Sequence, residues 1–249
     1  LSSVRPISCA IATSELVGDF DHFAQFASAL AGRHLVVDER VFDSEMSTTH
    51  HNLASAHLMA AYGVVDDPGA AVEAYVRQCS LNVDVRDLAT MAATLANGGV
   101  QPDTGERFMS ELTARQVLSV MTTCGMYDAA GDWLSTVGIP AKSGVSGGII
   151  GVLPGQVGVA VFSPNLDQHG NSARGVAMMK RLSADMGMHL MSPGRPSRSA
   201  IAEVRVEDDC TVYVLRGDLL FASAESLIRQ LVAEPPSTPQ VIFDLTMVD

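Results

Sequence analysis

The sequence predicts an α+β protein, and two observations lead to this fold class. Apolar residues recur at helical spacing through most of the chain up to Met191. Before the last helical stretch, Gly148–Leu153 and Gln156–Ser163 are rich in Val and Ile, and Pro154-Gly155 separates them. This pattern is typical of an antiparallel hairpin with a tight turn, and helices around such a hairpin form a layered α+β structure.

The helices are predicted from their apolar period together with the residues that start and stop them. Asp84 followed by Asp87 is typical of an N-terminal cap, and Asn97-Gly98-Gly99 of a helix end. Pro68 opens one helix, and Gly63 stops the helix before it. We expect helices at Thr13–Leu30, Ser47–Tyr62, Pro68–Cys79, Asp84–Asn97, Thr113–Thr123 and Ser172–Met191.

A second domain is predicted after a linker. Residues 192–199 combine Pro, Gly and Ser without apolar periodicity, which is typical of a linker between domains 1–191 and 200–249. In the second domain we expect strands 202–206 and 211–216, helix 222–232 and strand 241–245. A small α/β domain needs more elements to cover both faces of its sheet. We therefore expect this domain to be incomplete or to be covered by something else.

Composition excludes several classes of partner. The chain of 249 residues is 47% hydrophobic, as is normal for a globular protein. Acidic residues number 28 and basic residues 16, for a net charge of -12. Such a protein repels phosphate backbones and anionic lipids, and its sequence holds no apolar run long enough to cross a bilayer. We therefore expect neither nucleic acid nor membrane as a partner.

Cysteine and histidine spacing gives no sign of a metal site. No C-x-x-C pair occurs, and the neighbouring His50, His51 and His57 do not recur at the i, i+4 spacing that would bring them onto one helix face. The sequence also lacks the glycine-rich phosphate loops, so we expect no metal and no cofactor. The four cysteines are Cys9, Cys79, Cys124 and Cys210. We expect them to be buried free thiols in a cytoplasmic protein.

The clearest local signal for chemistry is Lys142-Ser143-Gly144 at the start of a predicted strand. Lys142 supplies a cation, Ser143 a hydroxyl, and the glycines that follow let a substrate approach the backbone. Penicillin-binding proteins and class A β-lactamases carry a K-T-G of this kind beside their nucleophile. A motif of this length also recurs by chance, so both interpretations stay open.

Tyr127 follows the end of a predicted helix and can present its hydroxyl to a cleft. A phenol has a pKa of about 10, so it needs a nearby cation such as Lys142 to act as a base. The alternative is that the ring packs and the hydroxyl bonds a carbonyl.

Glu45 and Asn52 are seven residues apart, which is two turns of a helix, so we expect both on one face. A carboxylate and an amide together suit an amino-acid substrate. The alternative is that Glu45 stabilises a helix dipole and that Asn52 is an ordinary surface residue.

Several segments, in order along the chain, resemble the serine-dependent glutaminase family, which shares its fold with the serine β-lactamases. The similarity covers most of the chain from Ala10 to Met191. The segments that carry it are Ala10–Ser14, Phe42–Glu45 with Asn52–Ala54, Tyr75–Ser80, Met91–Gly99, Cys124–Asp128, Pro140–Val145 and Ser163–Ser172.

The resemblance implies a β-lactamase/transpeptidase-like fold and hydrolysis of L-glutamine to L-glutamate and ammonia through a glutamyl-serine ester, without a cofactor, by a homo-oligomer. Glu45, Asn52 and Tyr75 would hold the α-amino and α-carboxylate groups of glutamine. Tyr127 would hold or activate the nucleophile. The backbone N–H of Val145 would be a hydrogen-bond donor of the oxyanion hole. Lys142 and Ser143 would line the same wall.

The family's nucleophile lies in an S-x-x-K motif upstream of these segments, and the chain contains no S-x-x-K. We therefore expect a fragment that begins after that motif and that is inactive by itself.

Residues from Val204 onward resemble a STAS domain at Leu215–Leu219 and Val241–Thr246. The later STAS segment that can carry a phosphorylated Ser is missing, so the resemblance implies a partial STAS domain. Such a domain implies a regulatory protein as partner. Two other functions stay open: a penicillin-recognising serine hydrolase, and a non-catalytic interaction protein that uses the STAS region.

Overall fold

The computed structural model describes residues 4–18, 20–192, 200–217, 219 and 221–248. The chain forms two compact units. The first, here called the N-terminal unit, contains residues up to 134 and 140–176, and the second, the C-terminal unit, contains 135–139 and 177–249. The predicted linker lies outside the described residues, except for Ser192. No helix in the described ranges combines the length and the apolar character that crossing a bilayer requires.

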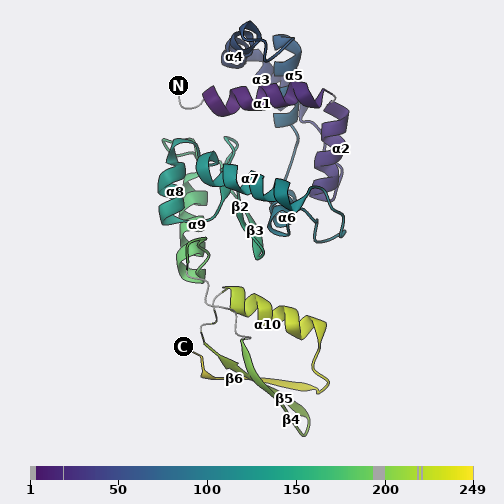
Figure 1. Ribbon diagram of the computed structural model, residues 1–249, viewed down its shortest axis with the longest axis vertical. Coiled ribbons are helices and arrows are strands. Elements are labelled where there is room, and N and C mark those ends of the chain that lie inside the picture. Colours follow the sequence, from purple (N-terminus) through teal and green to yellow (C-terminus); the bar gives the residue numbers. More distant parts are fainter. Residues whose placement is uncertain (1–3, 19, 193–199, 218, 220, 249) are drawn as a thin grey trace. The chain divides into compact units, whose positions relative to one another are not determined.

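Helices and strands mix as expected for an α+β protein (Figure 1). In chain order the elements are α1 Val4–Val17, α2 Phe20–Ala31, α3 Glu39–Ser47, α4 His50–Ala61, α5 Pro68–Cys79, α6 Val85–Ala96, α7 Glu111–Cys124, the 3-10 turn η1 Tyr127–Ala129, α8 Ala130–Thr136, β1 Ala141–Ser143, β2 Gly148–Leu153, β3 Val157–Phe162, α9 Ala173–Met186, β4 Ile201–Glu207, β5 Cys210–Arg216, α10 Phe221–Ala233 and β6 Gln240–Met247.

The predicted helix Thr13–Leu30 is wrong, because the structure has two helices there. Gly18 adopts the left-handed conformation, with φ of 73°, and separates α1 from α2. Apolar residues continue across the break at helical spacing, which hid it in the sequence. Leu16 in that run is 87% exposed and so does not belong to a packed face.

The predicted helix Ser47–Tyr62 is also displaced. Helix α3 ends at Ser47, Thr48 and Thr49 interrupt the chain, and α4 begins at His50. Helix α3 was not predicted, although Asp38 caps it by accepting hydrogen bonds from the N–H groups of Arg40 and Val41. Glu45 and Asn52 therefore lie on different helices, and the prediction that they share one helix face is wrong.

Other boundaries follow the predicted caps. Asp84 and Asp87 form a reciprocal capping box at the start of α6. Helix α9 ends at Met186, before Gly187, so it is shorter than predicted. Helix α8 was not predicted, because its 7 residues around the buried Trp133 form only about two turns, which are too few to show a helical period.

The sheet of the N-terminal unit has the order β1-β2-β3, with both pairs antiparallel. The predicted hairpin is therefore confirmed, and β1 adds the strand that carries Lys142 and Ser143 opposite Ile150 and Ile149. Helix α6 lies against β2 and β3 (Figure 1). The approach is so close that a Cβ placed on Gly158 of β3 would lie 2.1 Å from the backbone nitrogen of Ala93. Glycine is thus required where β3 meets the helix.

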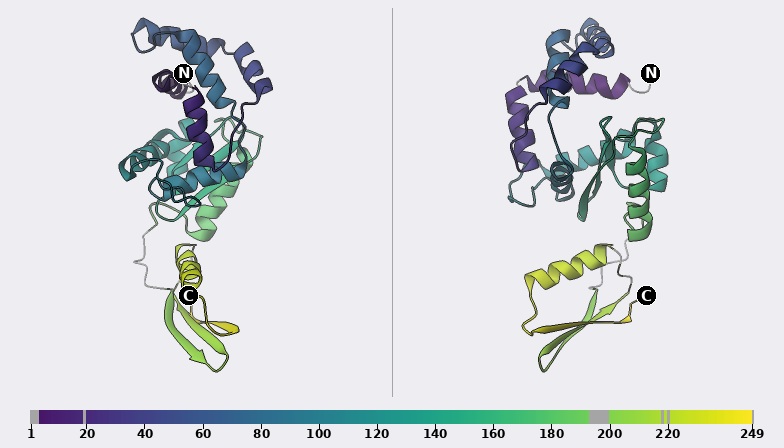
Figure 2. Two further views of the ribbon diagram at one scale, coloured as in Figure 1. Left: turned by 90° about the vertical axis from the view of Figure 1, so that its right-hand side faces the viewer. Right: turned by 180° about the vertical axis from the view of Figure 1, so that it is seen from behind.

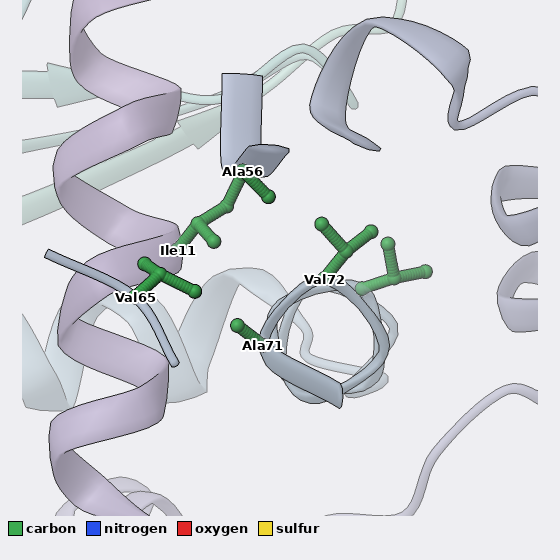
Figure 3. Close-up of a cluster of buried hydrophobic side chains, with 6 residues drawn as sticks. Ile11, Ala56, Val65, Ala71 and Val72 are labelled. Atoms are coloured by element: carbon green, nitrogen blue, oxygen red, sulfur yellow. The ribbon is translucent and has the colours of Figure 1, made fainter. Parts of the chain in front are cut away.

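The helices α1, α4 and α5 lie against one another (Figure 2), and an apolar cluster fills the space between them. Ile11, Ala56, Val65, Ala71 and Val72 are buried there and point toward one another (Figure 3). Burial of such side chains contributes about 25 cal/mol per Å² of apolar surface. This cluster fixes α5, which carries Tyr75, relative to α4.

The C-terminal unit has the strand order β4-β5-β6, with β5 and β6 parallel and connected through α10. Helix α10 covers one face of this sheet (Figure 1), where Tyr213 and Leu215 pack against Leu227 and Leu231. The predicted order of strand, strand, helix and strand is confirmed.

Replacing Asp87 by alanine is expected to lower the free energy of unfolding by about 2–3 kcal/mol. The buried carboxylate accepts hydrogen bonds from the N–H of Asp84 at 2.7 Å and from two guanidinium nitrogens of Arg33 at 2.7 and 2.5 Å. Urea unfolding followed by the fluorescence of Trp133, the single tryptophan of the chain, measures the change. Glu73→Ala removes an exposed carboxylate that lies 3.9 Å from the guanidinium of Arg77; it is the control and should change stability by less than about 0.5 kcal/mol. Equal effects of the two substitutions would contradict the prediction.

Candidate active site

Tyr127 and strand β1 are held together where α7 ends. A Cβ on Gly125, the residue after α7, would lie 1.8 Å from the carbonyl oxygen of Ala141, so only glycine lets the chain pass β1 at this distance. The N–H of Ser143 donates to the carbonyl of Gly125 at 3.1 Å. The hydroxyl of Tyr127 donates to the carbonyl of Ser143, also at 3.1 Å. The motif around Lys142 and the motif around Tyr127 therefore form one wall.

Lys142 lies over the face of the Tyr127 ring, with its ammonium nitrogen 4.6 Å from the ring centroid. The ammonium also donates to the carbonyl of Ser143. Burial lowers the pKa of Lys142, while the nearby thiols of Cys124 and Cys79 act in the opposite direction. Burial raises the pKa of Tyr127. The phenol is therefore protonated at neutral pH and can donate a hydrogen bond.

Tyr75 and Glu45 belong to the same group of side chains. Burial raises the pKa of Tyr75, and the charges of Cys79, Tyr127 and Glu45 raise it further. The charges of Glu45 on α3 and of Tyr127 on η1 thus both act on Tyr75 of α5, although the three residues are far apart in the sequence. Helix α3 also packs against α5.

The thiol of Cys79 links this group to Lys142. Burial is the largest influence on the thiol and raises its pKa. A hydrogen bond with Tyr75 lowers this pKa. Of the two nearby charges, that of Glu45 raises the pKa and that of Lys142 lowers it. Cys79 is nevertheless accessible to solvent. The expectation of buried cysteines is wrong for Cys79 and Cys124, which are exposed, and for Cys210, which is only half-buried. Cys79 belongs to Tyr75–Ser80, one of the segments that resemble the glutaminase family, but nothing in the sequence indicated that it is part of the site.

Asn52 has a different surrounding. Its side-chain nitrogen donates to the hydroxyl of Thr49 at 3.0 Å, at the start of α4. Within the described part of the chain, no hydrogen bond connects Asn52 with Glu45, Tyr75 or Tyr127. The side chain of Asn52 is therefore held at the start of α4, and its role in the site stays a prediction.

Val145 lies in the exposed loop between β1 and β2, and 73% of its surface is accessible. The loop is fixed by hydrogen bonds from Gly144 N–H to Gly148 and from Gly147 N–H to Gly144, at 2.8 and 2.9 Å. Among the described residues, no hydrogen bond uses the N–H of Val145, so this donor is available to a ligand. Two residues earlier in the chain, the hydroxyl of Ser143 is buried and has no hydrogen-bond partner among those residues.

No three His, Cys, Asp or Glu side chains of the described ranges lie close enough to hold a metal ion together. The groups that interact with Tyr75, Cys79 or the Tyr127 ring are instead a carboxylate, two phenols, a thiol and an ammonium. Such a set can bind a small zwitterion by charge and hydrogen bonding.

Alkylation of Cys79 should report whether Glu45 and Lys142 face it. Glu45→Gln removes a charge that raises the thiol's pKa, so at pH 8 we expect iodoacetamide to react about two- to threefold faster with Cys79. Lys142→Gln removes a charge that lowers this pKa, so the reaction should become slower by a similar factor. Mass spectrometry of peptides measures the rates, with Cys210 of the C-terminal unit as the internal control. Unchanged rates at Cys79 in both variants would show that neither Glu45 nor Lys142 lies near the thiol.

Comparison with known proteins identifies the family of the chain. Residues 7–191 match the family model described as Glutaminase. The glutaminase of Corynebacterium glutamicum is 44% identical over 248 residues, which cover 96% of this chain and 60% of the relative. The glutaminase of Corynebacterium efficiens is 47% identical over 224 residues, covering 90% of this chain and 53% of the relative.

Among solved structures, the one titled "Crystal Structure Analysis of Mglu" matches with a TM-score of 0.74 and 44% identity, covering 98% of this chain and 63% of that chain. The structure of Mglu in its glutamate form matches with a TM-score of 0.74 and 46% identity over 91% of this chain and 54% of that chain. The chain thus spans 53% to 60% of the two curated relatives above. The family model matches well over half of the chain, and on this evidence the chain belongs to the glutaminase family.

Proposed function

We propose that this protein hydrolyses L-glutamine to L-glutamate and ammonia through a glutamyl-serine ester. The observation that carries the proposal is the grouping of Glu45, Tyr75 and Tyr127 beside Lys142. The relatives above are named glutaminases, and Mglu has a glutamate form, which supports glutamine and glutamate as the ligands.

The side chains have chemically distinct roles in this proposal. The carboxylate of Glu45 binds the α-ammonium group of glutamine, and the protonated phenol of Tyr75 donates to the α-carboxylate. Asn52 binds the polar groups of the substrate from α4. Tyr127 holds the nucleophile, and Lys142 and Ser143 line the wall beside it.

The reaction is acyl transfer. The serine oxygen bonds to the side-chain carbonyl carbon of glutamine, and negative charge grows on the carbonyl oxygen, where the N–H of Val145 donates. The carbon–nitrogen bond then breaks, and ammonia leaves with the proton that the serine gave up. Water next cleaves the ester, which releases glutamate and restores the serine.

The serine is proposed to come from the family's S-x-x-K segment, which these 249 residues do not contain. The antiparallel β2–β3 pair beside the Lys142-Ser143-Gly144 strand supports a β-lactamase/transpeptidase-like arrangement. We therefore propose that the chain by itself does not turn over glutamine.

The C-terminal residues are proposed to be part of a STAS domain that binds a regulatory protein in a cytoplasmic homo-oligomer. The mixed β4-β5-β6 sheet under α10 supports this. Val241, Phe243 and Leu245 of β6 remain 39%, 45% and 54% exposed, which supports the expectation that something covers the sheet.

The test uses a joined protein, in which a supplied N-terminal segment with an S-x-x-K motif precedes Leu1. We expect it to release ammonia from L-glutamine and to act far more slowly on glutaramate, which has the same amide but no α-ammonium for Glu45. The Glu45→Gln variant should lose most of this preference. Labelled penicillin tests the alternative, since stable acylation by it without ammonia release from glutamine would favour a penicillin-recognising enzyme.

A further inference from the structure

The loop of residues 163–172, here called the Asp167 loop, is fixed by its own hydrogen bonds. The carboxylate of Asp167 accepts from the N–H groups of His169 and Asn171, at 2.9 and 3.0 Å. The N–H of Asp167 donates to the carbonyl of Asn171 at 2.8 Å. A loop with this many internal bonds keeps its shape and can hold a neighbouring segment in place.

The Asp167 loop contacts the chain on both sides of Tyr127. On one side, the ring nitrogen Nδ1 of His169 lies 2.9 Å from the carboxylate of Asp128. On the other, the side-chain nitrogen of the buried Asn171 donates to the carbonyl of Met126 at 3.5 Å. At the ring itself, a Cβ on Gly170 would lie 3.9 Å from Cε2 of Tyr127.

Tyr127 needs such support because its backbone conformation is unfavourable. Its φ is 56°, in the left-handed region, which costs a residue with a side chain roughly 1–2 kcal/mol. A conformation of this kind persists only where the surroundings hold it. The hydroxyl of Tyr127 then reaches the carbonyl of Ser143, in the wall described above.

We propose that His169 and Asn171 are positioning residues for Tyr127, acting through Asp128 and the Met126 carbonyl on either side of it. The catalytic part of this inference rests on the proposed function, in which Tyr127 holds the nucleophile. The positioning part concerns the folded chain alone and is measurable without turnover.

Removal of the His169 contact should leave the fold intact. The His169 and Asp128 side chains are 35% and 52% exposed, and a polar contact as accessible as this one contributes about 0–1 kcal/mol to stability. His169→Ala is therefore the main variant, and Asn171→Ala, at a buried position, is the second.

The experiment is NMR of the chain labelled with ¹³C at the Cζ of its four tyrosines. In His169→Ala and in Asp128→Ala we expect the Tyr127 resonance to move toward that of an exposed tyrosine and its pKa to fall toward about 10. Asp128→Asn keeps an oxygen that accepts from His169, so its Tyr127 resonance should stay at the wild-type position. The Tyr213 resonance of the C-terminal unit should not move in any variant.

His57→Ala is the matched control, since His57 is an exposed histidine of α4, and it should leave the Tyr127 resonance unchanged. In the joined protein, His169→Ala should lower kcat about tenfold. A Tyr127 resonance that stays at its wild-type position in folded His169→Ala and folded Asn171→Ala would overturn the proposal. A joined protein that hydrolyses no glutamine would refute the proposed function instead, and would leave the NMR result as a separate answer on positioning.

Discussion

Replacing Gly125 by alanine is expected to destabilise the N-terminal unit by about 3 kcal/mol. Gly125 has ordinary right-handed helical angles, so its backbone would accept alanine without strain. The added methyl group would however lie 1.8 Å from the carbonyl oxygen of Ala141 and 2.5 Å from that of Met121. Both neighbours are backbone atoms that cannot rotate away, so β1 must move and its hydrogen bond to Gly125 is lost.

Urea unfolding followed by Trp133 fluorescence measures this loss. Gly131→Ala is the control, because nothing lies within 4 Å of a Cβ at Gly131 in α8. This variant should gain about 0.5–1 kcal/mol from the helical preference of alanine. If Gly125→Ala and Gly131→Ala unfold at the same urea concentration, Gly125 cannot lie as close to the backbone of β1 as described above.

Replacing Tyr127 by phenylalanine is expected to lower kcat of the joined protein about a hundredfold. The substitution keeps the ring under the ammonium of Lys142 and removes only the hydroxyl. Stability should fall by only about 1 kcal/mol, because a single hydrogen bond to the carbonyl of Ser143 is lost. The rate loss and the stability loss are thus very different in size.

Tyr62→Phe is the matched control, since it makes the same chemical change at a tyrosine that is 80% exposed. Ammonia release should proceed in this variant at the rate of the unsubstituted joined protein. A Tyr127→Phe variant with equal kcat would exclude any role of this phenol in holding the nucleophile.

Local signals in the sequence predicted the elements whose ends have strong caps. The helix from Pro68 and the helix capped by Asp84 have the predicted starts, and the hairpin around Pro154-Gly155 has the predicted pairing. The break at Gly18 was missed, because apolar residues keep the helical period on both sides of it, and α3 before Thr48-Thr49 was not predicted at all.

Motifs in the sequence identified most of the candidate site, but its assembly depends on long-range packing. Glu45, Tyr75 and Tyr127 come from three elements, and no local pattern predicts that these elements meet. The same is true of His169, which lies 41 residues from Asp128 in the sequence and 2.9 Å from it in space. Gly125 and Gly158 also look like ordinary glycines until the neighbouring backbone is known.

In the proposed function these residues form the glutamine-binding wall and need a serine from an S-x-x-K segment. The decisive measurement is ammonia release from L-glutamine by the 249-residue chain and by the joined protein, at equal concentration. We expect turnover by the joined protein and none above background by the chain itself. Equal turnover by both would contradict the need for that serine, and no turnover by a folded joined protein would contradict the assignment of the wall.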